Sequence, residues 1–433
     1  MNDVAEVRLW GRNIGAVALQ ADSDVAEFEY DPAFVNSRIE VAPLTLPLSR
    51  RVFRFPELPR QTFHGLPGLL ADSLPDKFGH ALINAWLARK GRPPASMNAV
   101  ERLCYTGARG MGALEFRPAI GPRATRSRRL EVDALVELAS EVLSSRDRLH
   151  ATFDEDTSES AMADILRVGT SAGGARAKAV IAWNPDTGEV RSGQVPVAEG
   201  FEHWILKFDG VRSNRDRELD DPQGYGAIEY AYYLMATAAG IDMEQCRLFE
   251  ENGRRHFMTR RFDRDRHGGK RHMQSLCALA HFDYNLPGAY SYEQAFQVIR
   301  RLGLGPNAVE QQFRRMVFNL VARNHDNHVK NIAFLMDKRG QWRLSPAFDV
   351  TFSYNPGGDW TSSHQMSVNG KRDGFELEDL RACARNATMK RGRAETILAE
   401  VKAAVAEWPR FADRADLPLE ISRRLAGLHR DIH

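Results

Sequence analysis

The 433-residue sequence predicts an α+β protein in which strand-rich units precede a helical one. Short alternating runs such as VRLW and FEYD, broken by Pro and Gly, open the chain and predict strands. A second group of short strands with hairpin signals follows in the middle of the chain. From residue 290 onward, apolar residues recur at helical spacing. Because the chain is longer than one compact core accommodates, we expect several units.

Three units can be separated by composition and pattern. Residues 1–118 form a strand-rich N-terminal unit with a helical stretch at 70–89. Residues 130–258 form a second strand-rich unit, and residues 259–433 form a helical unit. The segment 120–129, IGPRATRSRR, combines turn residues with a cluster of arginines and is the best linker candidate.

The second unit carries a local signal for each of its elements. Asn252-Gly253 is a strong hairpin signal, and Gly240 is a plausible helix C-cap. We expect strands at 178–183, 189–197, 203–208, 246–251 and 254–262, and a helix at 229–239.

Composition excludes several classes of function. The net charge of +2 is far below that of a dedicated nucleic-acid binder. The four cysteines are scattered without C-x-x-C spacing, which argues against a zinc site or a disulfide framework. The chain shows no signal-peptide pattern and no apolar run of about 18–20 residues. We therefore expect a cytoplasmic protein without membrane contact.

The most informative stretch is NHDNHVKN at residues 324–331. It follows an amphipathic helix with an apolar face made of Phe313, Met316, Val317, Leu320 and Val321. Asp326 and Asn331 stand in D-x-x-x-x-N spacing, in which protein kinases place a catalytic base and a metal-binding Asn. Such a pair alone is common on loops that form Asx turns.

The residues after this motif make the signal more specific. A predicted hairpin, IAFLMDKRGQWRL, leads to Asp349 in the segment SPAFDV. A hard cation such as Mg²⁺ needs oxygen ligands, and kinases place a second metal-binding Asp after a similar hairpin. The order of helix, motif, hairpin and Asp therefore predicts phosphotransfer from ATP with Mg²⁺, on a kinase-like fold with a strand-rich and a helical lobe.

A glycine-rich stretch, VGTSAGGARAK at 168–178, precedes the first predicted hairpin of the second unit. Glycine lets backbone N–H groups approach phosphates closely. The stretch does not fit the Walker pattern, because Gly174 is followed by Ala175 rather than Lys. A phosphate-binding loop and a flexible turn are both open from the sequence.

Lys207 lies inside the apolar strand HWILKF. A lysine in such a run must reach solvent or find a partner, because burial of an unpaired charge is costly. The kinase interpretation gives it ATP phosphates and a helix carboxylate, for which Glu229 is well placed. The alternative is a solvent-facing lysine on the polar side of the strand.

Several segments resemble the HipA family, the serine/threonine kinase toxins of bacterial toxin–antitoxin systems. They are TSAGGARAKA, WILKF, RRFDR at 260–264, NHDNHVKN, SPAFDV, LPGLLADSLPDKFG at 66–79 and RLCYTGARGMGALEF at 102–116. The resemblance covers most of the chain. It implies a two-lobe, protein-kinase-like fold with an extra N-terminal strand-rich subdomain, and it implies ATP and Mg²⁺ as ligands.

The resemblance also implies roles for particular residues. Asp326 becomes the catalytic base, Asn331 and Asp349 the magnesium ligands, Glu229 the partner of Lys207, and Ser171 a site of autophosphorylation that switches the kinase off. The ATP-binding residues are then Gly173, Gly174, Ala175, Arg176, Ala177, Lys178, Lys207, Arg260, Arg261, Phe262, His328, Lys330, Asn331 and Asp349. The doubled glycine and Arg176, where an acidic residue is common, depart from the best-known members.

The implied partners are a protein substrate and a HipB-like helix-turn-helix antitoxin, with DNA contacted only through the antitoxin complex. Some HipA-type kinases phosphorylate aminoacyl-tRNA synthetases, which makes that class a possible substrate. Two other functions stay open at this point. One is a kinase-shaped binding module without activity. The other is a metal-dependent phosphohydrolase that uses His325 and Asp326, with His272, His281 and Asp349 as further metal ligands.

Overall fold

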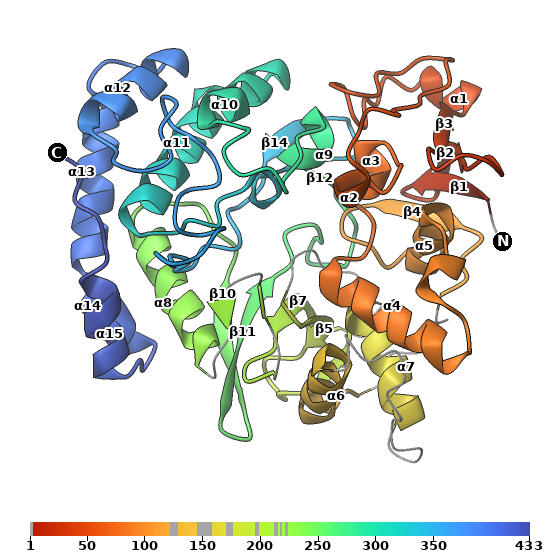
Figure 1. The fold of residues 1–433 in the computed structure, drawn as a ribbon, viewed down its shortest axis with the longest axis horizontal. Helices are drawn as coiled ribbons and strands as arrows, with labels where there is room; N and C mark the ends of the chain where they lie inside the picture. Colours follow the sequence, from red (N-terminus) through yellow and green to blue (C-terminus); the bar gives the residue numbers. More distant parts are fainter. Residues whose placement is uncertain are drawn as a thin grey trace.

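The computed structural model describes residues 3–121, 129–144, 158–169, 176–194, 199–211, 215–216, 219–220 and 224–433. Figure 1 shows a unit of strands and short helices from the N-terminal part of the chain at one side. A five-stranded sheet lies below the centre, and long helices from the C-terminal part lie at the other side. The structure is therefore the predicted α+β architecture, with two lobes and an additional N-terminal unit.

The N-terminal unit is built on a four-stranded antiparallel sheet in the order β3-β2-β1-β4. Its strands are β1 (Val4–Leu9), β2 (Arg12–Ala18), β3 (Glu27–Tyr30) and β4 (Leu114–Arg117). Trp10 and Gly11 both have positive φ and join β1 to β2 in a tight hairpin. Alternate residues of β1 are buried in a core of their own, so this sheet has one packed face.

Short helices connect β3 to β4. They are α1 (Pro32–Val35), α2 (Arg60–Phe63), α3 (Gly68–Ala71), α4 (Lys77–Arg89), the 3₁₀ helix η1 (Pro94–Ser96) and α5 (Ala99–Thr106). The helix expected at 70–89 is thus two helices. The first, α3, ends at Ala71, and Pro75, which lacks a backbone N–H, lies in the gap that follows it. Asp76 starts the second by accepting a hydrogen bond from the backbone N–H of Gly79.

The strand-rich lobe contains a five-stranded antiparallel sheet in the order β10-β11-β7-β5-β6. Its strands are β5 (Lys178–Trp183), β6 (Val190–Ser192), β7 (Glu202–Lys207), β10 (Cys246–Glu251) and β11 (Arg254–Arg260). The predicted hairpin between β10 and β11 is confirmed, with Asn252 and Gly253 both at positive φ. Two short strands, β8 (Arg215–Asp216) and β9 (Leu219–Asp220), form a separate pair.

Four helices border this sheet or share its core. α6 (Val132–Ser144) and α7 (Ser158–Gly169) pack with α4 of the N-terminal unit, whereas α8 (Tyr225–Ala238) packs against β10 and β11. Apolar residues of α4, α6, α7, β5 and β7 share one hydrophobic core. The N-terminal unit is therefore joined to the strand-rich lobe by continuous packing, and not by a linker alone.

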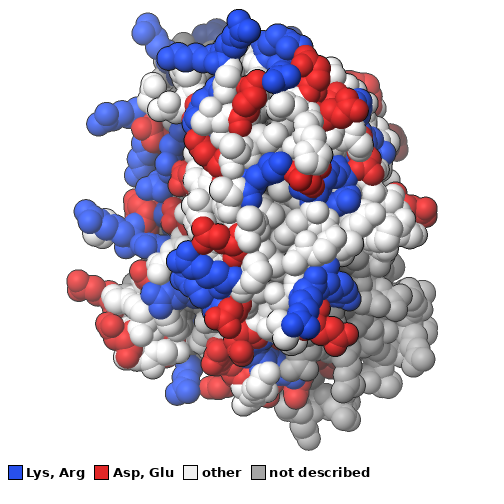
Figure 2. All heavy atoms as spheres, turned by 90° about the vertical axis from the view of Figure 1, so that its left-hand side faces the viewer, with Lys and Arg blue, Asp and Glu red and all other residues white. Residues whose placement is uncertain are grey.

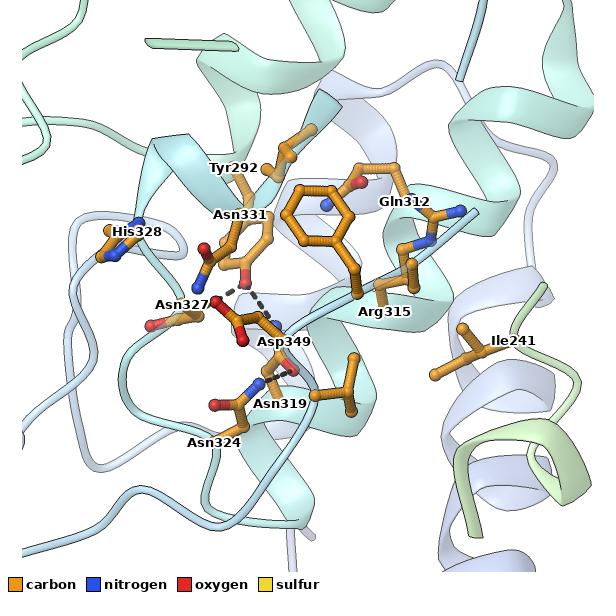
Figure 3. A pocket seen from close by; sticks show the side chains of 14 residues that line it. Ile241, Tyr292, Gln312, Arg315, Asn319, Asn324, Asn327, His328, Asn331 and Asp349 are labelled. Carbon is orange, nitrogen blue, oxygen red and sulfur yellow. Dashed lines mark hydrogen bonds between the residues drawn. The ribbon is translucent and has the colours of Figure 1, made fainter. Parts of the chain in front are cut away.

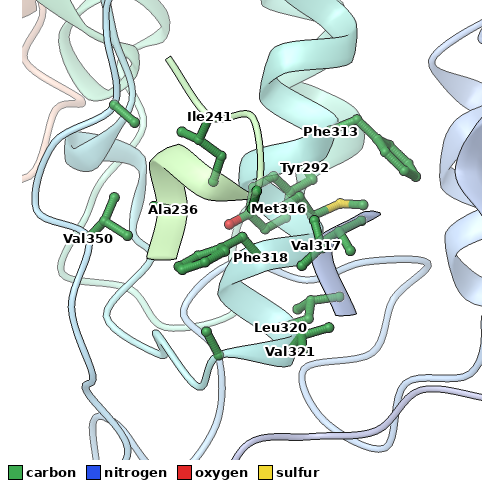
Figure 4. Packing of buried hydrophobic residues seen from close by; sticks show 14 of the residues in the cluster. Ala236, Ile241, Tyr292, Phe313, Met316, Val317, Phe318, Leu320, Val321 and Val350 are labelled. Atoms are coloured by element: carbon green, nitrogen blue, oxygen red, sulfur yellow. The ribbon is translucent and has the colours of Figure 1, made fainter. Parts of the chain in front are cut away.

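The C-terminal lobe is mostly helical, as predicted. Its helices are α9 (Leu276–Ala280), α10 (Tyr292–Arg301), α11 (Pro306–Val321), α12 (Leu377–Asn386), α13 (Arg393–Ala406), α14 (Trp408–Arg414) and α15 (Leu419–Ala426). The apolar face predicted for α11 lies in the core of this lobe, and Figure 4 shows its side chains packed with those of neighbouring segments. Phe318, on the same helix, is also fully buried.

A three-stranded sheet lies next to α11. It contains the predicted hairpin, β13 (Ala333–Met336) and β14 (Trp342–Leu344), together with β12 (His272–Ser275). The sequence analysis did not predict β12, because four residues carry too little pattern to be read alone. Met336 and Trp342 of this hairpin pack against the N-terminal core, so the third sheet joins the N-terminal unit to the helical lobe.

Charges of both signs are interspersed on the side of the molecule that carries α12–α15. Figure 2 shows Lys and Arg side chains beside Asp and Glu on this face. Arg381 pairs with Glu395 at 2.8 Å, and Arg385 pairs with Glu378 at 2.9 Å. This face therefore lacks the one-sided basic surface typical of nucleic-acid binding. Among the described helices, none is both long and apolar enough to cross a bilayer.

Candidate active site

The centre of the candidate site is a lysine that lies between two carboxylates. Lys207, the last residue of β7, donates from Nζ to Oε1 of Glu229 at 2.6 Å and also to Oδ1 of Asp349. Along β7, Trp204 and Leu206 point into the hydrophobic core, so Lys207 faces the opposite side of the strand. Glu229 comes from the start of α8, and Asp349 from the segment after β14. The fold thus joins three distant segments at one ammonium group.

The charges of this centre are strongly coupled. Burial acts to lower the pKa of Lys207, but the carboxylates of Asp349 and Glu229 raise it above its usual value. Burial acts to raise the pKa of Asp349, but Lys207 and Lys178 hold it well below its usual value. Lys207 and Asp349 are therefore both expected to be ionised near neutral pH. A carboxylate in this state is suited to ligate a divalent cation.

Asp349 also has an unusual backbone conformation. Its φ is 57°, in the left-handed region that non-glycine residues seldom adopt. Such strain persists only where the surroundings hold it, and it is concentrated at functional sites. Here the strain accompanies the placement of the carboxylate against Lys207.

The D-x-x-x-x-N motif forms a closed loop. It begins after α11 and ends in the 3₁₀ helix η2 (Val329–Asn331). Nδ2 of Asn331 donates to the backbone carbonyl of Asp326 at 2.9 Å, which leaves Oδ1 of the amide as the atom that can accept a cation. Asn331 and Asp349 line the same pocket (Figure 3). One amide oxygen and one carboxylate on a shared pocket are hard oxygen donors, so these residues fit a bound Mg²⁺.

The carboxylate of Asp326 is held from outside the motif. Nε1 of Trp360 donates to Oδ1 of Asp326 at 2.7 Å. The backbone N–H of Asp326 donates to Oγ of Ser353 at 2.9 Å, and that hydroxyl donates to Oδ1 of Asn324 at 2.8 Å. Nε2 of His328 lies 3.9 Å from the same carboxylate oxygen. Two segments that follow Asp349 therefore fix the orientation of the proposed base.

Behind the loop lies a network of amides around one tyrosine. The hydroxyl of Tyr292 accepts from Nδ2 of Asn319 at 3.0 Å and from Nδ2 of Asn327 at 2.8 Å, as Figure 3 shows. Nδ2 of Asn324 donates to Oδ1 of Asn319 at 3.0 Å. Burial raises the pKa of Tyr292 to about 12. All four side chains are thus neutral hydrogen-bonding groups that link the loop to α10 and α11.

Comparison with known proteins assigns the chain to a family. A family model for the HipA-like C-terminal domain matches residues 170–408, and a model for the HipA N-terminal domain matches residues 5–117. The chain belongs to the HipA family. The resemblance noted in the sequence is thereby confirmed, including the extra N-terminal unit.

Two relatives of this HipA-family chain differ in how much of it they cover. A chain from the solved toxin–antitoxin complex of HipA, HipB and operator DNA from Shewanella oneidensis MR-1 superposes with a TM-score of 0.66. It covers 98% of this chain and 94% of its own length at 17% identity, which demonstrates a shared fold. The protein named Putative kinase Y4mE from Sinorhizobium fredii is 29% identical over 136 residues. That match spans 29% of this chain and about a third of the relative.

The remaining predicted ATP-binding residues of this HipA-family chain fall into several environments. Ser171, Gly173, Gly174 and Ala175 lie outside the described residues. The guanidinium of Arg176 lies 3.6 Å from the ring centroid of Tyr225, and its charge helps to lower the pKa of Asp349. Ala177 is buried. Lys178 and Lys330 both lie near the N-terminal unit, where Nζ of Lys178 is 3.5 Å from Oδ2 of Asp76.

The segment 260–262, which the family resemblance places among the ATP-binding residues, is firmly anchored. The backbone N–H of Arg260 donates to Gln245, and that of Arg261 donates to His203. The guanidinium of Arg261 is buried and makes two hydrogen bonds to Asp263, at 2.9 and 2.7 Å. These side-chain and N–H groups are therefore engaged within the fold. Phe262 packs on Phe348, which lines the pocket.

The histidines proposed for a phosphohydrolase do not converge. His272 lies at hydrogen-bonding distance, 3.0 Å, from the carbonyl of Val41, and Nε2 of His281 accepts from the backbone N–H of Gly68. His325 packs against His364 with ring centroids 4.0 Å apart, and burial lowers the pKa of His325 to about 3. Within the described part of the chain, no group of three or more His, Cys, Asp or Glu side chains is arranged to hold a metal ion.

Sequence analysis did not identify Trp360, Ser353, Tyr292 or Asp76 as parts of the site. Trp360 follows Asp326 by 34 residues, and it has no fixed spacing that would have marked it. The Asn residues at 324 and 327 were visible in the motif, but their roles depend on Tyr292, which the fold brings from another helix.

Proposed function

We propose that this protein is an ATP- and Mg²⁺-dependent serine/threonine protein kinase that acts as the toxin of a toxin–antitoxin pair. The observation that carries the proposal is the bridge from Lys207 to Glu229 and Asp349. This bridge lies at the pocket that Asn331 also lines, and Asn331 is hydrogen-bonded to Asp326. A lysine paired with a helix carboxylate and placed beside a metal-binding Asp is the arrangement that kinases use to bind ATP.

The proposed residue roles follow from charge and position. Lys207, Lys178 and Arg176 offset the negative charge of the ATP phosphates. Asp349 and Oδ1 of Asn331 would hold Mg²⁺, which would supply further positive charge to the phosphates. Asp326 orients the substrate hydroxyl and accepts its proton.

The reaction is an ordinary phosphoryl transfer. The oxygen of a serine or threonine hydroxyl forms a bond to the γ-phosphorus of ATP. The bond between that phosphorus and the β–γ bridging oxygen breaks, and ADP leaves with the electron pair. The hydroxyl proton passes to Asp326. The hydrogen bond from Nε1 of Trp360 to Oδ1 of Asp326 supports this role, because it fixes the orientation of the carboxylate.

The site favours this activity over the other two functions. A binding module without activity has no need of Lys207, Asp326, Asn331 and Asp349 together, and here all four belong to one connected arrangement. A phosphohydrolase needs histidines that converge on the metal. Here His272 contacts the carbonyl of Val41, and His281 accepts a hydrogen bond from the backbone N–H of Gly68. The geometry therefore supports a kinase best.

The proposed partners follow from the family. The Shewanella HipA structure was solved with HipB and operator DNA. We propose a HipB-like helix-turn-helix antitoxin for this chain and contact with DNA only through that antitoxin. The substrate would be a cytoplasmic protein, with an aminoacyl-tRNA synthetase as one candidate. Ser171 is the proposed autophosphorylation site, since a phosphate there would carry close to two negative charges and compete with ATP for the phosphate loop.

Phosphotransfer by purified protein tests the proposal. With Mg-ATP, the wild type is expected to phosphorylate itself and proteins of a cell extract, as measured by intact-mass spectrometry and phosphoproteomics. Asp326→Asn should lower the rate by roughly a hundredfold or more, because the base is lost. A control variant, Asp337→Asn, changes an exposed turn residue of the β13–β14 hairpin and should leave the rate unchanged. Equal rates in wild type and Asp326→Asn would contradict the proposal.

A further inference from the structure

The segment LPGLLADSLPDKFG of the N-terminal unit contains two carboxylates that face the kinase-like lobes. Asp72 follows α3, and Asp76 immediately precedes α4. The segment marked the chain as a HipA-family member, but the proposed reaction gives it no task. The contacts of these two carboxylates indicate one.

Asp72 contacts the helical lobe. Its Oδ2 accepts from the backbone N–H of Ser275 at 2.7 Å, and its Oδ1 accepts from the hydroxyl of the same residue at 2.8 Å. Ser275 in turn starts α9, because its hydroxyl accepts from the backbone N–H of Ala278 at 3.1 Å. Asp72 therefore joins the N-terminal unit to the end of β12 and the beginning of α9.

Asp76 contacts the strand-rich lobe, and its two oxygens have separate tasks. Oδ1 accepts from the backbone N–H of Gly79 at 2.6 Å and starts α4. Oδ2 lies 3.5 Å from Nζ of Lys178, the first residue of β5. Both side chains are almost completely buried, with 3% of Asp76 and 2% of Lys178 exposed. Burial of a charged group is costly unless an opposite charge lies close to it.

Lys178 connects this contact to the candidate active site. It pairs with Lys207 across β5 and β7, and its charge helps to lower the pKa of Asp349. Asp76 of the N-terminal unit thus meets a lysine that lies beside the centre of the candidate site.

The charge of Asp76 is more than helix capping requires. Asn caps a helix about as well as Asp does. Burial raises the pKa of Asp76 to about 6 even though Lys178 and the N–H of Gly79 favour its ionised form. The carboxylate is therefore costly to bury, and a neutral cap would serve α4 equally well. The ionised group has a role where it meets Lys178.

We propose that Asp72 and Asp76 form an acidic clamp, in which Asp72 holds the N-terminal unit on the helical lobe through Ser275 while Asp76 fixes Lys178 in position to bind the phosphates of ATP. This inference rests on the proposed kinase function. In this role Asp76 is a positioning residue, because it acts on the nucleotide only through Lys178. The N-terminal unit is then an integral part of the ATP site.

The variant Asp76→Asn separates the clamp from helix capping, since it keeps the cap and removes the charge. We expect the full-length variant to bind a non-hydrolysable Mg-ATP analogue roughly tenfold more weakly, as loss of one charge-assisted contact predicts. The matched control is Asp31→Asn. Asp31 caps α1 in the same unit by accepting from Ala33 at 2.8 Å, and no lysine pairs with it among the described residues. The control should bind like the wild type, and both variants should melt near the wild-type temperature.

A double-mutant cycle with Lys178→Gln tests the mechanism. If Asp76 acts through Lys178, the double variant should bind the analogue as weakly as Lys178→Gln alone. If the losses of affinity caused by Asp76→Asn and Lys178→Gln instead add in the double variant, the positioning role of Asp76 is wrong. Should Asp76→Asn prove unstable, Asp76→Ser offers another neutral cap for the same cycle.

Hydrogen exchange in the nucleotide-free protein separates failure of the clamp from failure of the kinase proposal. The account predicts faster exchange of the β5 amides in Asp76→Asn than in Asp31→Asn. If exchange is faster in Asp76→Asn but the wild type binds no nucleotide, the kinase function is contradicted. The clamp then remains as a contact between units. Unchanged exchange together with wild-type affinity would overturn the clamp.

Discussion

The two sides of the candidate active site are held by different kinds of interaction. On the side of the proposed base, the loop that carries Asp326 is fixed by neutral groups, including Asn319, Asn327 and Tyr292. On the phosphate side, Lys207 is fixed by the carboxylates of Glu229 and Asp349. Neutral hydrogen bonds fix the geometry of a site and add no charged groups to it. Ion pairs fix the geometry and also place charged groups at the site.

This difference suits the two tasks. A proton acceptor must keep its position while its own charge changes. The amides around the loop stay neutral during proton transfer, so their hydrogen bonds persist. In the proposed kinase, the phosphate side would receive a highly charged nucleotide and a cation. Before a ligand binds, the buried lysines and carboxylates of this side neutralise one another. A ligand charge can then take the place of one partner in an existing ion pair. Loss of a group should therefore have different consequences on the two sides.

The contact between Trp360 and Asp326 allows the base side to be tested. Trp360→Phe keeps an aromatic ring but removes the N–H that donates to Oδ1 of Asp326. Loss of one such hydrogen bond to a charged group should lower kcat by roughly tenfold, with the KM for ATP nearly unchanged. Steady-state kinetics would measure both constants.

The matched control for this variant is Trp408→Phe. Nε1 of Trp408 also donates a buried hydrogen bond, to the carbonyl of Ser422 in the helical lobe. This variant should lose some stability, but its kcat should stay near the wild-type value. If the two variants lowered kcat equally, the loss would reflect packing, and the orienting role of Trp360 would be wrong.

The tyrosine behind the catalytic loop should matter for stability more than for rate. Tyr292→Phe leaves the buried amides of Asn319 and Asn327 without the hydroxyl that accepts from them. The free energy of unfolding should fall by about 1–3 kcal/mol, the usual cost of unsatisfied buried donors. The rate of phosphotransfer should change by less than about threefold, since Tyr292 touches no reacting group. Denaturant unfolding measures the first effect, and an unchanged unfolding free energy would contradict this part of the account.

The sequence indicated features that depend on local order and spacing, and it missed features of another class. Asp326, Asn331 and Asp349 were predicted because their chemistry depends on order and spacing along a short stretch, and the structure has the helix and hairpin expected around them. Lys207 stood out because a charge in an apolar strand needs a partner. The hairpin at Asn252 and Gly253 was predicted by turn geometry alone.

The missed features depend on long-range packing. Trp360 reaches Asp326, and Asp76 reaches Lys178, only after separate units have assembled. Tryptophan and aspartate are common in many settings, so neither residue type signals such a contact by itself. The split of the helix expected at 70–89 was visible in Pro75, but helical spacing on both sides concealed it.

The most direct test of the central claim is a comparison of Mg-ATP affinity in two variants. The variants Asp349→Asn and Asp326→Asn each remove one carboxylate, one from each side of the site, by the same chemical change. Calorimetry measures the Mg-ATP affinity of both. Asp349→Asn should abolish Mg²⁺-dependent binding, since it removes the metal carboxylate and one partner of Lys207. Asp326→Asn should bind Mg-ATP with nearly wild-type affinity, since this residue acts on the substrate hydroxyl. Wild-type affinity in Asp349→Asn, or equal losses in both variants, would contradict the division of the site into a phosphate side and a base side.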